Sequence, residues 1–257
     1  DQFGKLLKDT ITNTGIEAKG LVMDQDIHTT LAFVHTFPDG DREFSFYRKP
    51  GADMLMEAKD VDAAWFQDAY ALHFCSVSLG EFPMKEAHRK AIDCARRAGC
   101  MISFDPNIRL PLWENPEALR NVIWEFAPMA HVLKISDEEL EFITGKADIK
   151  EALPRLFAGN TRLVIYTKGA DGAECYTERT SAYADGQKVK AVDTTGAGDG
   201  FIGAFLFCMA KDGVEVDQLA SLSREQLEKY LAFANKFCAK SITKYGAIAS
   251  YPTLTEM

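Results

Sequence analysis

A short run of small residues between two aspartates is the part of this sequence best suited to chemistry. Residues 193–199 read Asp-Thr-Thr-Gly-Ala-Gly-Asp and lead directly into an apolar stretch. Small side chains at 196–198 let the backbone approach a ligand closely, so N–H groups at a helix start can face an anion. Asp199, which ends the run, is placed to accept a proton from an attacking hydroxyl. This combination suits the transfer of a phosphoryl group.

The same run also has interpretations that do not involve phosphoryl transfer. In one alternative, the glycines merely form a tight turn and Asp199 merely caps the helix, and neither takes part in catalysis. A Walker A loop is excluded, because no Gly-Lys-Ser/Thr follows the glycines. A dinucleotide fold is disfavoured, because no Gly-x-Gly-x-x-Gly follows a first strand.

Alternating strand and helix patterns surround this run and must position it. From residue 61 onward, buried strands are predicted at 69–76, 101–104, 131–134 and 163–167, and a hairpin at 173–190. Helices are predicted at 3–13, 83–98, 116–127, 137–144, 149–157, 199–211 and 224–242. Such alternation implies an α/β fold with a mostly parallel sheet and helices on both faces. Ligands in such folds bind at the carboxyl ends of the strands.

A β-rich insert interrupts this rhythm near the start of the chain. Residues 21–23, 29–34 and 43–47 are predicted strands, and the Pro-Asp-Gly-Asp at 38–41 is a predicted turn. We therefore divide the chain into an α/β core at 1–17 and 49–257 and a small β lid at 18–48. An apolar lid face that includes Leu31, Phe33 and Phe44 would support dimerisation through the lid strands.

Composition excludes several classes of partner. The net charge of −9 without a basic patch argues against nucleic acid. The longest apolar run, residues 201–210, is too short to span a membrane. Six cysteines without a Cys-x-x-Cys pair, and no visible signal peptide, predict reduced thiols in a cytoplasmic protein.

The complete run at 193–199 resembles the signature of the PfkB-type, ribokinase-like carbohydrate kinases, and the resemblance extends over essentially the whole chain. It implies a ribokinase-like α/β fold with a β lid and an ATP-dependent kinase with a small sugar as substrate. In this family the final aspartate is the catalytic base, which corresponds to Asp199. The amides that form the anion hole correspond to Gly196, Ala197 and Gly198.

The same resemblance implies the sites for ATP, magnesium and potassium. Ser136 replaces the Asn of the family's Asn-x-x-Glu motif, and Glu139 keeps the Glu, which organises Mg²⁺ through water; a plain helix capping box explains the pair equally well. The implied ATP-binding residues are Ser136, Thr167, Lys168, Gly169, Gly172, Gly198, Asn235 and Ala247. A monovalent cation, K⁺, is implied at Asp193, Thr195, Ser241, Lys244, Gly246 and Ser250.

Two further segments resemble the fructokinase branch. Arg48 and Asp53 follow the lid and are expected to bind substrate, although Asp53 can equally cap a helix. Arg109, in the run Asp-Pro-Asn-Ile-Arg, is expected to stabilise charge on the transferring phosphate, with a surface salt bridge as its alternative. D-fructose phosphorylated at O6 is the expected reaction. The alternatives are a riboside or nucleoside kinase, a 2-keto-3-deoxygluconate kinase, and a silent nucleotide-binding remnant.

One family feature is not found in this sequence. The family pattern opens with a strand, a substrate-binding Asp and a Gly-Gly-x-x-x-Asn segment, and none of these precedes Asp1. We expect a polypeptide without this segment to phosphorylate fructose poorly or not at all.

Overall fold

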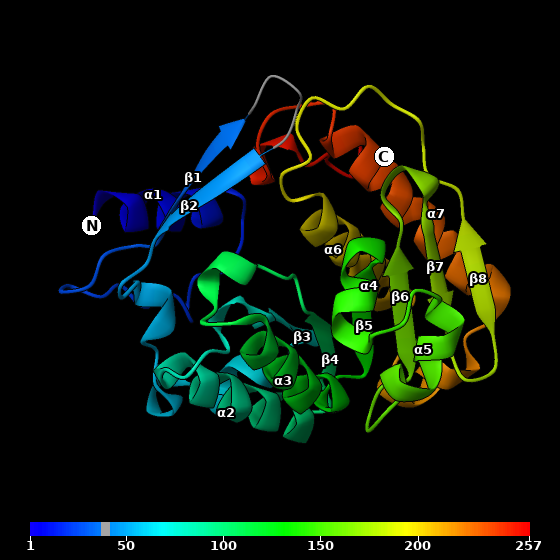
Figure 1. Ribbon diagram of the computed structural model, residues 1–257, viewed down its shortest axis with the longest axis horizontal. Coiled ribbons are helices and arrows are strands. Elements are labelled where there is room, and N and C mark those ends of the chain that lie inside the picture. Colours follow the sequence, from blue (N-terminus) through cyan, green and yellow to red (C-terminus); the bar gives the residue numbers. More distant parts are fainter. Residues whose placement is uncertain (37–41) are drawn as a thin grey trace. The chain divides into compact units, whose positions relative to one another are not determined.

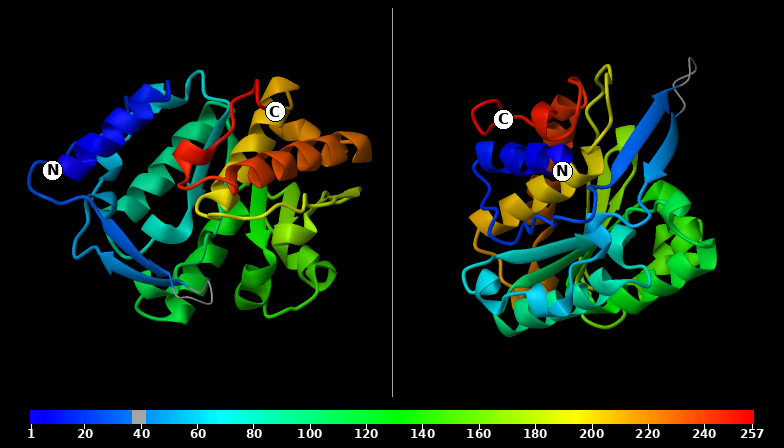
Figure 2. Two further views of the ribbon diagram at one scale, coloured as in Figure 1. Left: turned by 90° about the horizontal axis from the view of Figure 1, so that it is seen from above. Right: turned by 90° about the vertical axis from the view of Figure 1, so that its left-hand side faces the viewer.

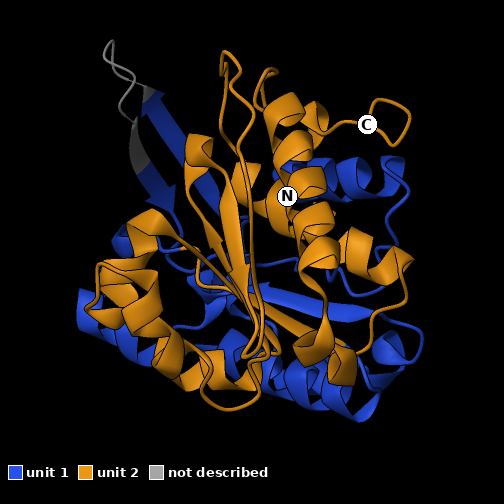
Figure 3. Cartoon of the chain, turned by 90° about the vertical axis from the view of Figure 1, so that its right-hand side faces the viewer, with its two compact units in different colours: residues 1–100, 108–122 blue, residues 101–107, 123–257 orange. Residues whose placement is uncertain are grey.

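The computed structural model describes residues 1–36 and 42–257, which divide into two compact units. Unit 1 comprises residues 1–100 and 108–122, and unit 2 comprises residues 101–107 and 123–257 (Figure 3). The division predicted from sequence, a lid at 18–48 and a core at 1–17 and 49–257, is based on the pattern of strands and not on compactness. It stays a prediction.

Unit 1 contains the predicted N-terminal helix and a two-stranded antiparallel sheet. The sheet pairs Leu31 with Tyr47 and Phe33 with Ser45, and it forms a ribbon in both views of Figure 2. The strand predicted at 21–23 is wrong, because these residues have no strand conformation. The predicted turn at 38–41 lies outside the described residues. The main elements are α1 (Gln2–Asn13), β1 (Leu31–Thr36), β2 (Arg42–Tyr47), β3 (Ala71–Cys75) and α2 (Pro83–Arg97).

Unit 2 carries most of the larger sheet, whose six strands have the order β3-β4-β5-β6-β7-β8. β4 runs parallel to β5 and β5 parallel to β6, whereas β6-β7-β8 is an antiparallel meander. The hairpin predicted at 173–190 therefore exists, but its strands end at Ala184. The strands are β4 (Met101–Asp105), β5 (Val132–Ser136), β6 (Leu163–Thr167), β7 (Ala173–Tyr176) and β8 (Ser181–Ala184).

Helices cover both faces of this part of the sheet. α6 and α7 lie on one face and α4 and α5 on the other (Figures 1 and 2). β4 is buried along its whole length, and the other central strands are nearly so, which explains their unbroken apolar sequences. The helices of unit 2 are α4 (Asp137–Thr144), α5 (Ile149–Leu156), α6 (Ala197–Lys211) and α7 (Arg224–Ser241), whereas α3 (Pro116–Phe126) begins in unit 1 and ends in unit 2.

The core of unit 2 joins α6 and α7 through aromatic side chains. Phe205 and Tyr230 are fully buried, and their ring centroids lie 5.7 Å apart in an edge-to-face arrangement. This packing holds α6, and therefore the glycine run at its first turn, against the rest of unit 2. Among the described residues, no helix is both long enough and apolar enough to cross a bilayer.

Candidate active site

Each of the strands β4, β5 and β6 ends at a polar residue, which is Asp105, Ser136 and Thr167 respectively. Parallel pairing aligns Phe104 with Leu133 and Ser136 with Thr167. Ser136 and Thr167, both expected to bind ATP, are therefore direct neighbours across two strands. This is the edge where an α/β sheet presents ligand-binding groups.

The glycine run starts α6 through one residue with a left-handed backbone. Gly196 is the N-cap, with φ 75°, and its carbonyl accepts a hydrogen bond from the Tyr251 hydroxyl at 2.8 Å. A Cβ at Gly196 would lie 2.7 Å from the Cβ of Ala247 and 2.8 Å from that hydroxyl. Below the turn, the Cys238 thiol donates to the Ala197 carbonyl at 3.1 Å. Burial raises the pKa of Cys238 to about 12, so this thiol keeps the proton that it donates.

We expect Gly196→Ala to destabilise the protein and to lower kcat/KM for phosphoryl transfer. The left-handed backbone alone costs an alanine about 1–2 kcal/mol, and the contacts with Ala247 and Tyr251 add to this. Gly203→Ala in the same helix is the matched control, because a Cβ at Gly203 meets nothing within 4 Å. The control should gain about 1 kcal/mol from helix propensity. Urea unfolding and steady-state kinetics measure both effects, and equal behaviour of the two variants would contradict the role of Gly196.

Asp199 lies in the first turn of α6 and is exposed to solvent. The first amides of a helix have no partner within the helix, and the helix dipole favours negative charge beside them. Asp199 also borders a cavity of 290 Å³ whose other walls are largely apolar, among them Phe207, Phe237, Tyr251 and Leu254. The run thus places an accessible carboxylate next to amides that can bind an anion.

A buried ion pair lies beside this turn. The Lys134 ammonium, on β5, is 2.9 Å from the Asp105 carboxylate at the end of β4, and both side chains are almost fully buried. A Cβ at Gly198 would lie only 3.3 Å from Lys134 Nζ. Burial raises the pKa of Asp105 to about 6, although Lys134 opposes this shift. Burial also acts to lower the pKa of Lys134, but the surrounding carboxylates, Asp105 first, outweigh it and raise that pKa.

Glu139 is tied to the start of α4. Its carboxylate accepts a hydrogen bond from the Ser136 amide at 2.9 Å, as expected for a helix cap. Within the described part of the chain, no group of three or more His, Cys, Asp or Glu side chains could hold a metal ion. A single carboxylate nevertheless fits Mg²⁺, which retains several waters and is completed by phosphate oxygens.

Two segments that contain residues expected to hold K⁺ are joined by the Asp193 side chain. Asp193 accepts from the Thr195 amide at 2.9 Å with one oxygen, and from the Gly246 amide at 2.9 Å with the other. The Lys244 amide donates to the Ser241 carbonyl at 3.0 Å, which forms the adjoining turn. The Ser250 hydroxyl donates to the Ala247 carbonyl at 2.8 Å. Loop 193–195 and residues 241–250 are thus held together, and their role toward a cation stays a prediction.

The loop after β6 closes against the end of the β7–β8 hairpin. Gly172 has φ 90°, and a Cβ there would lie 2.2 Å from the Ala184 carbonyl oxygen. Only glycine permits this approach, which brings Ala170 and Gly172 of the loop close to residues 184–186. The Lys168 ammonium pairs with Glu174 at 2.6 Å and lies 4.8 Å from the centroid of the Tyr183 ring. Its charge is therefore already partly balanced, and its contact with ATP stays a prediction.

Asn235, on α7, fixes the same hairpin end from the other side. Its side-chain amide donates to the carbonyls of Ala184 and Asp185 at 2.9 and 3.0 Å, and the residue is buried. We expect Asn235→Leu to leave both carbonyls without this donor and to cost about 1–3 kcal/mol of stability. The dissociation constant for an ATP analogue should rise in parallel, measured by calorimetry on folded protein. An unchanged constant would remove Asn235 from the nucleotide site.

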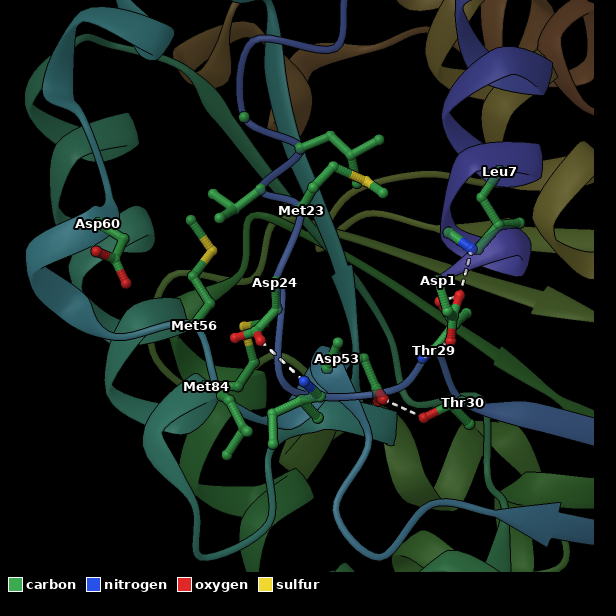
Figure 4. Close-up of a pocket in the computed structure, with 17 residues that line it drawn as sticks. Asp1, Leu7, Met23, Asp24, Thr29, Thr30, Asp53, Met56, Asp60 and Met84 are labelled. Carbon is green, nitrogen blue, oxygen red and sulfur yellow. Dashed lines mark hydrogen bonds between the residues drawn. The ribbon is translucent and has the colours of Figure 1, made fainter.

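Three further residues expected to function belong to unit 1. Arg48 is buried and pairs with Asp53, and Asp53 lines a cavity of 440 Å³ (Figure 4). Arg109 is exposed and donates to the Ile108 carbonyl at 2.8 Å. Its role at the transferring phosphate stays a prediction.

Sequence reasoning did not assign any role to Lys134 or Asp105. A signal was present, because a lysine inside the otherwise apolar strand 132–135 requires a buried partner. Asp105 also accepts from the Asn107 amide at 3.1 Å, which supports the left-handed Asn107 at φ 48°. The same aspartate thus joins the ion pair to the turn that precedes Arg109.

Comparison with known proteins identifies the family. The model described as pfkB family carbohydrate kinase matches residues 1–254. Fructokinase-2 of Solanum lycopersicum is 39% identical over 257 residues, which is 100% of this chain and 77% of that protein. A fructokinase with bound ATP from Xylella fastidiosa is 32% identical with a TM-score of 0.93, covering 100% of this chain and 80% of that one.

A riboside kinase has the same fold at lower identity. The aminoimidazole riboside kinase from Salmonella enterica, solved with aminoimidazole riboside and an ATP analogue, is 26% identical with a TM-score of 0.80. Its match covers 97% of this chain and 78% of that one. The expected family and ribokinase-like α/β fold are therefore confirmed. With this sequence, this fold and the glycine turn that precedes Asp199, the chain belongs to the pfkB family of carbohydrate kinases.

Proposed function

We propose that this protein transfers the γ-phosphoryl group of ATP to O6 of D-fructose. The observation that carries the proposal is the turn at Gly196–Gly198, which places Asp199 in the first turn of α6. Fructokinases among the relatives support the proposal. One of them, from Vibrio cholerae, is 31% identical to this chain and was solved with fructose and ADP bound.

Asp199 would act as the general base. The acceptor oxygen attacks the γ-phosphorus in line, the bond from that phosphorus to the leaving ADP oxygen breaks, and Asp199 takes the hydroxyl proton. Amides at the N-terminus of α6 would stabilise the charge on the transferring group. The Lys134 ammonium lies beside Gly198 as well, in its ion pair with Asp105.

ATP would bind at the carboxyl ends of β5 and β6. Ser136 and Thr167 lie there side by side, and Asn235 holds the hairpin end that borders the loop after β6. Mg²⁺, held through water by Glu139, supplies neutralisation of the phosphate oxygens when it is bound. A K⁺ ion beside Asp193 is part of the proposal, and hard oxygen ligands suit it.

The sugar would bind to unit 1. The 440 Å³ cavity there is lined by Asp53, Thr29 and Thr30, which can hydrogen-bond the hydroxyls of a neutral polyol. Arg109 is our candidate for contact with the transferring phosphate, because a guanidinium fork suits phosphate oxygens.

A homodimer through the lid strands also belongs to this proposal. Phe33 and Tyr47 are 57% and 68% exposed, and their ring centroids lie 5.3 Å apart. Exposed aromatic side chains on a two-stranded sheet favour burial against a partner. A cytoplasmic location fits six free cysteines.

The experiment is a coupled assay of ADP release with ATP, Mg²⁺ and a panel of acceptors. The panel contains D-fructose, D-ribose, aminoimidazole riboside and 2-keto-3-deoxy-D-gluconate. The highest kcat/KM should be found with fructose. If a riboside or the sugar acid is preferred, the substrate assignment is wrong. Binding of an ATP analogue without turnover of any acceptor would instead favour a silent nucleotide-binding protein.

A further inference from the structure

Arg48 is a buried cation whose charge is balanced by one carboxylate. Its side chain is 5% exposed, and its Nε donates to Asp53 Oδ2 at 2.8 Å. Its Nη2 lies 2.5 Å from the same oxygen and also donates to the Val77 carbonyl at 2.9 Å. The guanidinium lies over the Phe82 ring, 5.3 Å from its centroid. A guanidinium so far removed from water depends on its partner, because an unpaired buried charge is costly.

Asp53 is held in place from several sides. The Thr30 hydroxyl donates to its other carboxylate oxygen, Oδ1, and the Ser78 hydroxyl lies 3.5 Å from Oδ2. A Cβ at Gly51 would lie 1.9 Å from the Thr30 hydroxyl oxygen and 2.7 Å from Asp53 Oδ1. Only glycine at position 51 therefore allows this close packing. The carboxylate has a fixed orientation between Arg48 and the cavity.

The cavity beside Asp53 is acidic (Figure 4). The ionisable side chains that line it are Asp1, Asp24, Asp53 and Asp60, and no lysine, arginine or histidine is among the described residues that form its wall. The Asp53 side chain is 35% exposed, whereas Arg48 behind it is almost completely covered. A ligand in the cavity therefore meets the carboxylate and not the guanidinium. Carboxylates accept hydrogen bonds from sugar hydroxyls, and they repel an anionic ligand.

We propose that Asp53 is an internal counter-ion for Arg48 that selects neutral sugars and excludes sugar acids. The Asp53 carboxylate occupies the position at the guanidinium that the carboxylate of an acidic acceptor would take. This inference rests on the proposed sugar-kinase function and specifies the charge of its substrate. Without Asp53, the planar donor fork of Arg48 would border the cavity without a partner, and such a fork binds carboxylates bidentately.

The primary test compares two acceptors in three proteins. kcat/KM is measured for D-fructose and for 2-keto-3-deoxy-D-gluconate with the wild type, Asp53→Ala and Asp24→Asn. Asp53→Ala should shift the fructose-to-acid ratio by about 100-fold toward the acid, because charge-assisted hydrogen bonds are lost for one acceptor and gained for the other. Asp24→Asn removes a carboxylate from the same cavity wall, where the Asp24 side chain accepts hydrogen bonds from the backbone amides of residues 26 and 27. It should change the ratio by less than about 3-fold, since no buried cation is exposed. Equal shifts in both variants would refute the role of Asp53.

A binding readout separates this proposal from the kinase assignment. Melting temperatures are compared in sodium gluconate and in sodium chloride of equal ionic strength. Gluconate should stabilise Asp53→Ala and leave the wild type unchanged, whether or not any sugar is phosphorylated. If no acceptor is phosphorylated, the proposed function is contradicted, but the gluconate result still tests the role of Asp53.

A second variant covers the case in which Asp53→Ala folds poorly. Arg48→Met combined with Asp53→Ala removes both charges, and replacing a buried ion pair with uncharged groups is often nearly neutral for stability. This double variant should fold without gluconate and should not respond to it. The proposal is overturned if gluconate has no effect on Asp53→Ala, including a failure to restore its folding, or if the double variant responds equally.

Discussion

Asp199→Asn should lower kcat for fructose phosphorylation by about 10²–10⁴-fold, because it removes the group that accepts the hydroxyl proton. The loss should fall on kcat, while KM for ATP changes little, since Asn keeps the shape of the side chain. Asp199 is exposed in the first turn of α6, so the fold should tolerate the change. Losing a favourable charge at a helix N-terminus costs at most about 1 kcal/mol at such a site.

Asp212→Asn is the matched control for this prediction. Asp212 is the C-cap of the same helix and pairs with Lys229 at 2.8 Å, at the end opposite to Asp199. The control should keep kcat within about 2-fold, since an exposed ion pair contributes little even to stability. If Asp199→Asn retained more than about a tenth of wild-type kcat, Asp199 would be a helix cap rather than the base.

The parts of the site that depend on local sequence could be predicted. The glycine turn needs small residues at adjacent positions, and helix α6 follows directly, so both are encoded within residues 193–211. The buried strands were also predicted, because β4, β5 and β6 are covered on both faces and read as continuous apolar segments. Alternating elements then imply the sheet that brings Ser136 next to Thr167.

The parts that depend on contacts distant in sequence could not be predicted. The strand expected at 21–23 is absent, because a short apolar run forms a strand only where a partner offers backbone hydrogen bonds. Arg48 and Asp53 were both expected near the sugar, but only tertiary packing shows that one neutralises the other. Asp105 and Lys134 pair between adjacent strands, and nothing in the local pattern of either segment specifies the other.

Lys134→Met should destabilise the protein by about 3–5 kcal/mol, because it leaves the Asp105 carboxylate buried without its cation. Both side chains of the pair are more than nine-tenths buried, so solvent cannot replace the lost ammonium. Urea unfolding at neutral pH measures the loss. Lys134→Met combined with Asp105→Asn removes both charges and keeps an acceptor for the Asn107 amide. This double variant should recover most of the lost stability, and a double variant no more stable than Lys134→Met would contradict the pairing.

The pH dependence of the stability of Lys134→Met gives an independent check that Lys134 stabilises the ionised Asp105 carboxylate. Burial raises the pKa of Asp105 to about 6 in the folded protein, above its ordinary value. The folded state therefore binds this proton more tightly than the unfolded chain, so the contribution of Asp105 to stability falls as pH rises from about 4 to about 6 and then levels off. Without the Lys134 ammonium, which lowers that pKa, the fall should continue to higher pH. The stability gap between wild type and Lys134→Met should consequently be small near pH 5 and widen toward about pH 8. A gap that is constant over this range would mean that the buried Asp105 carboxylate does not depend on Lys134.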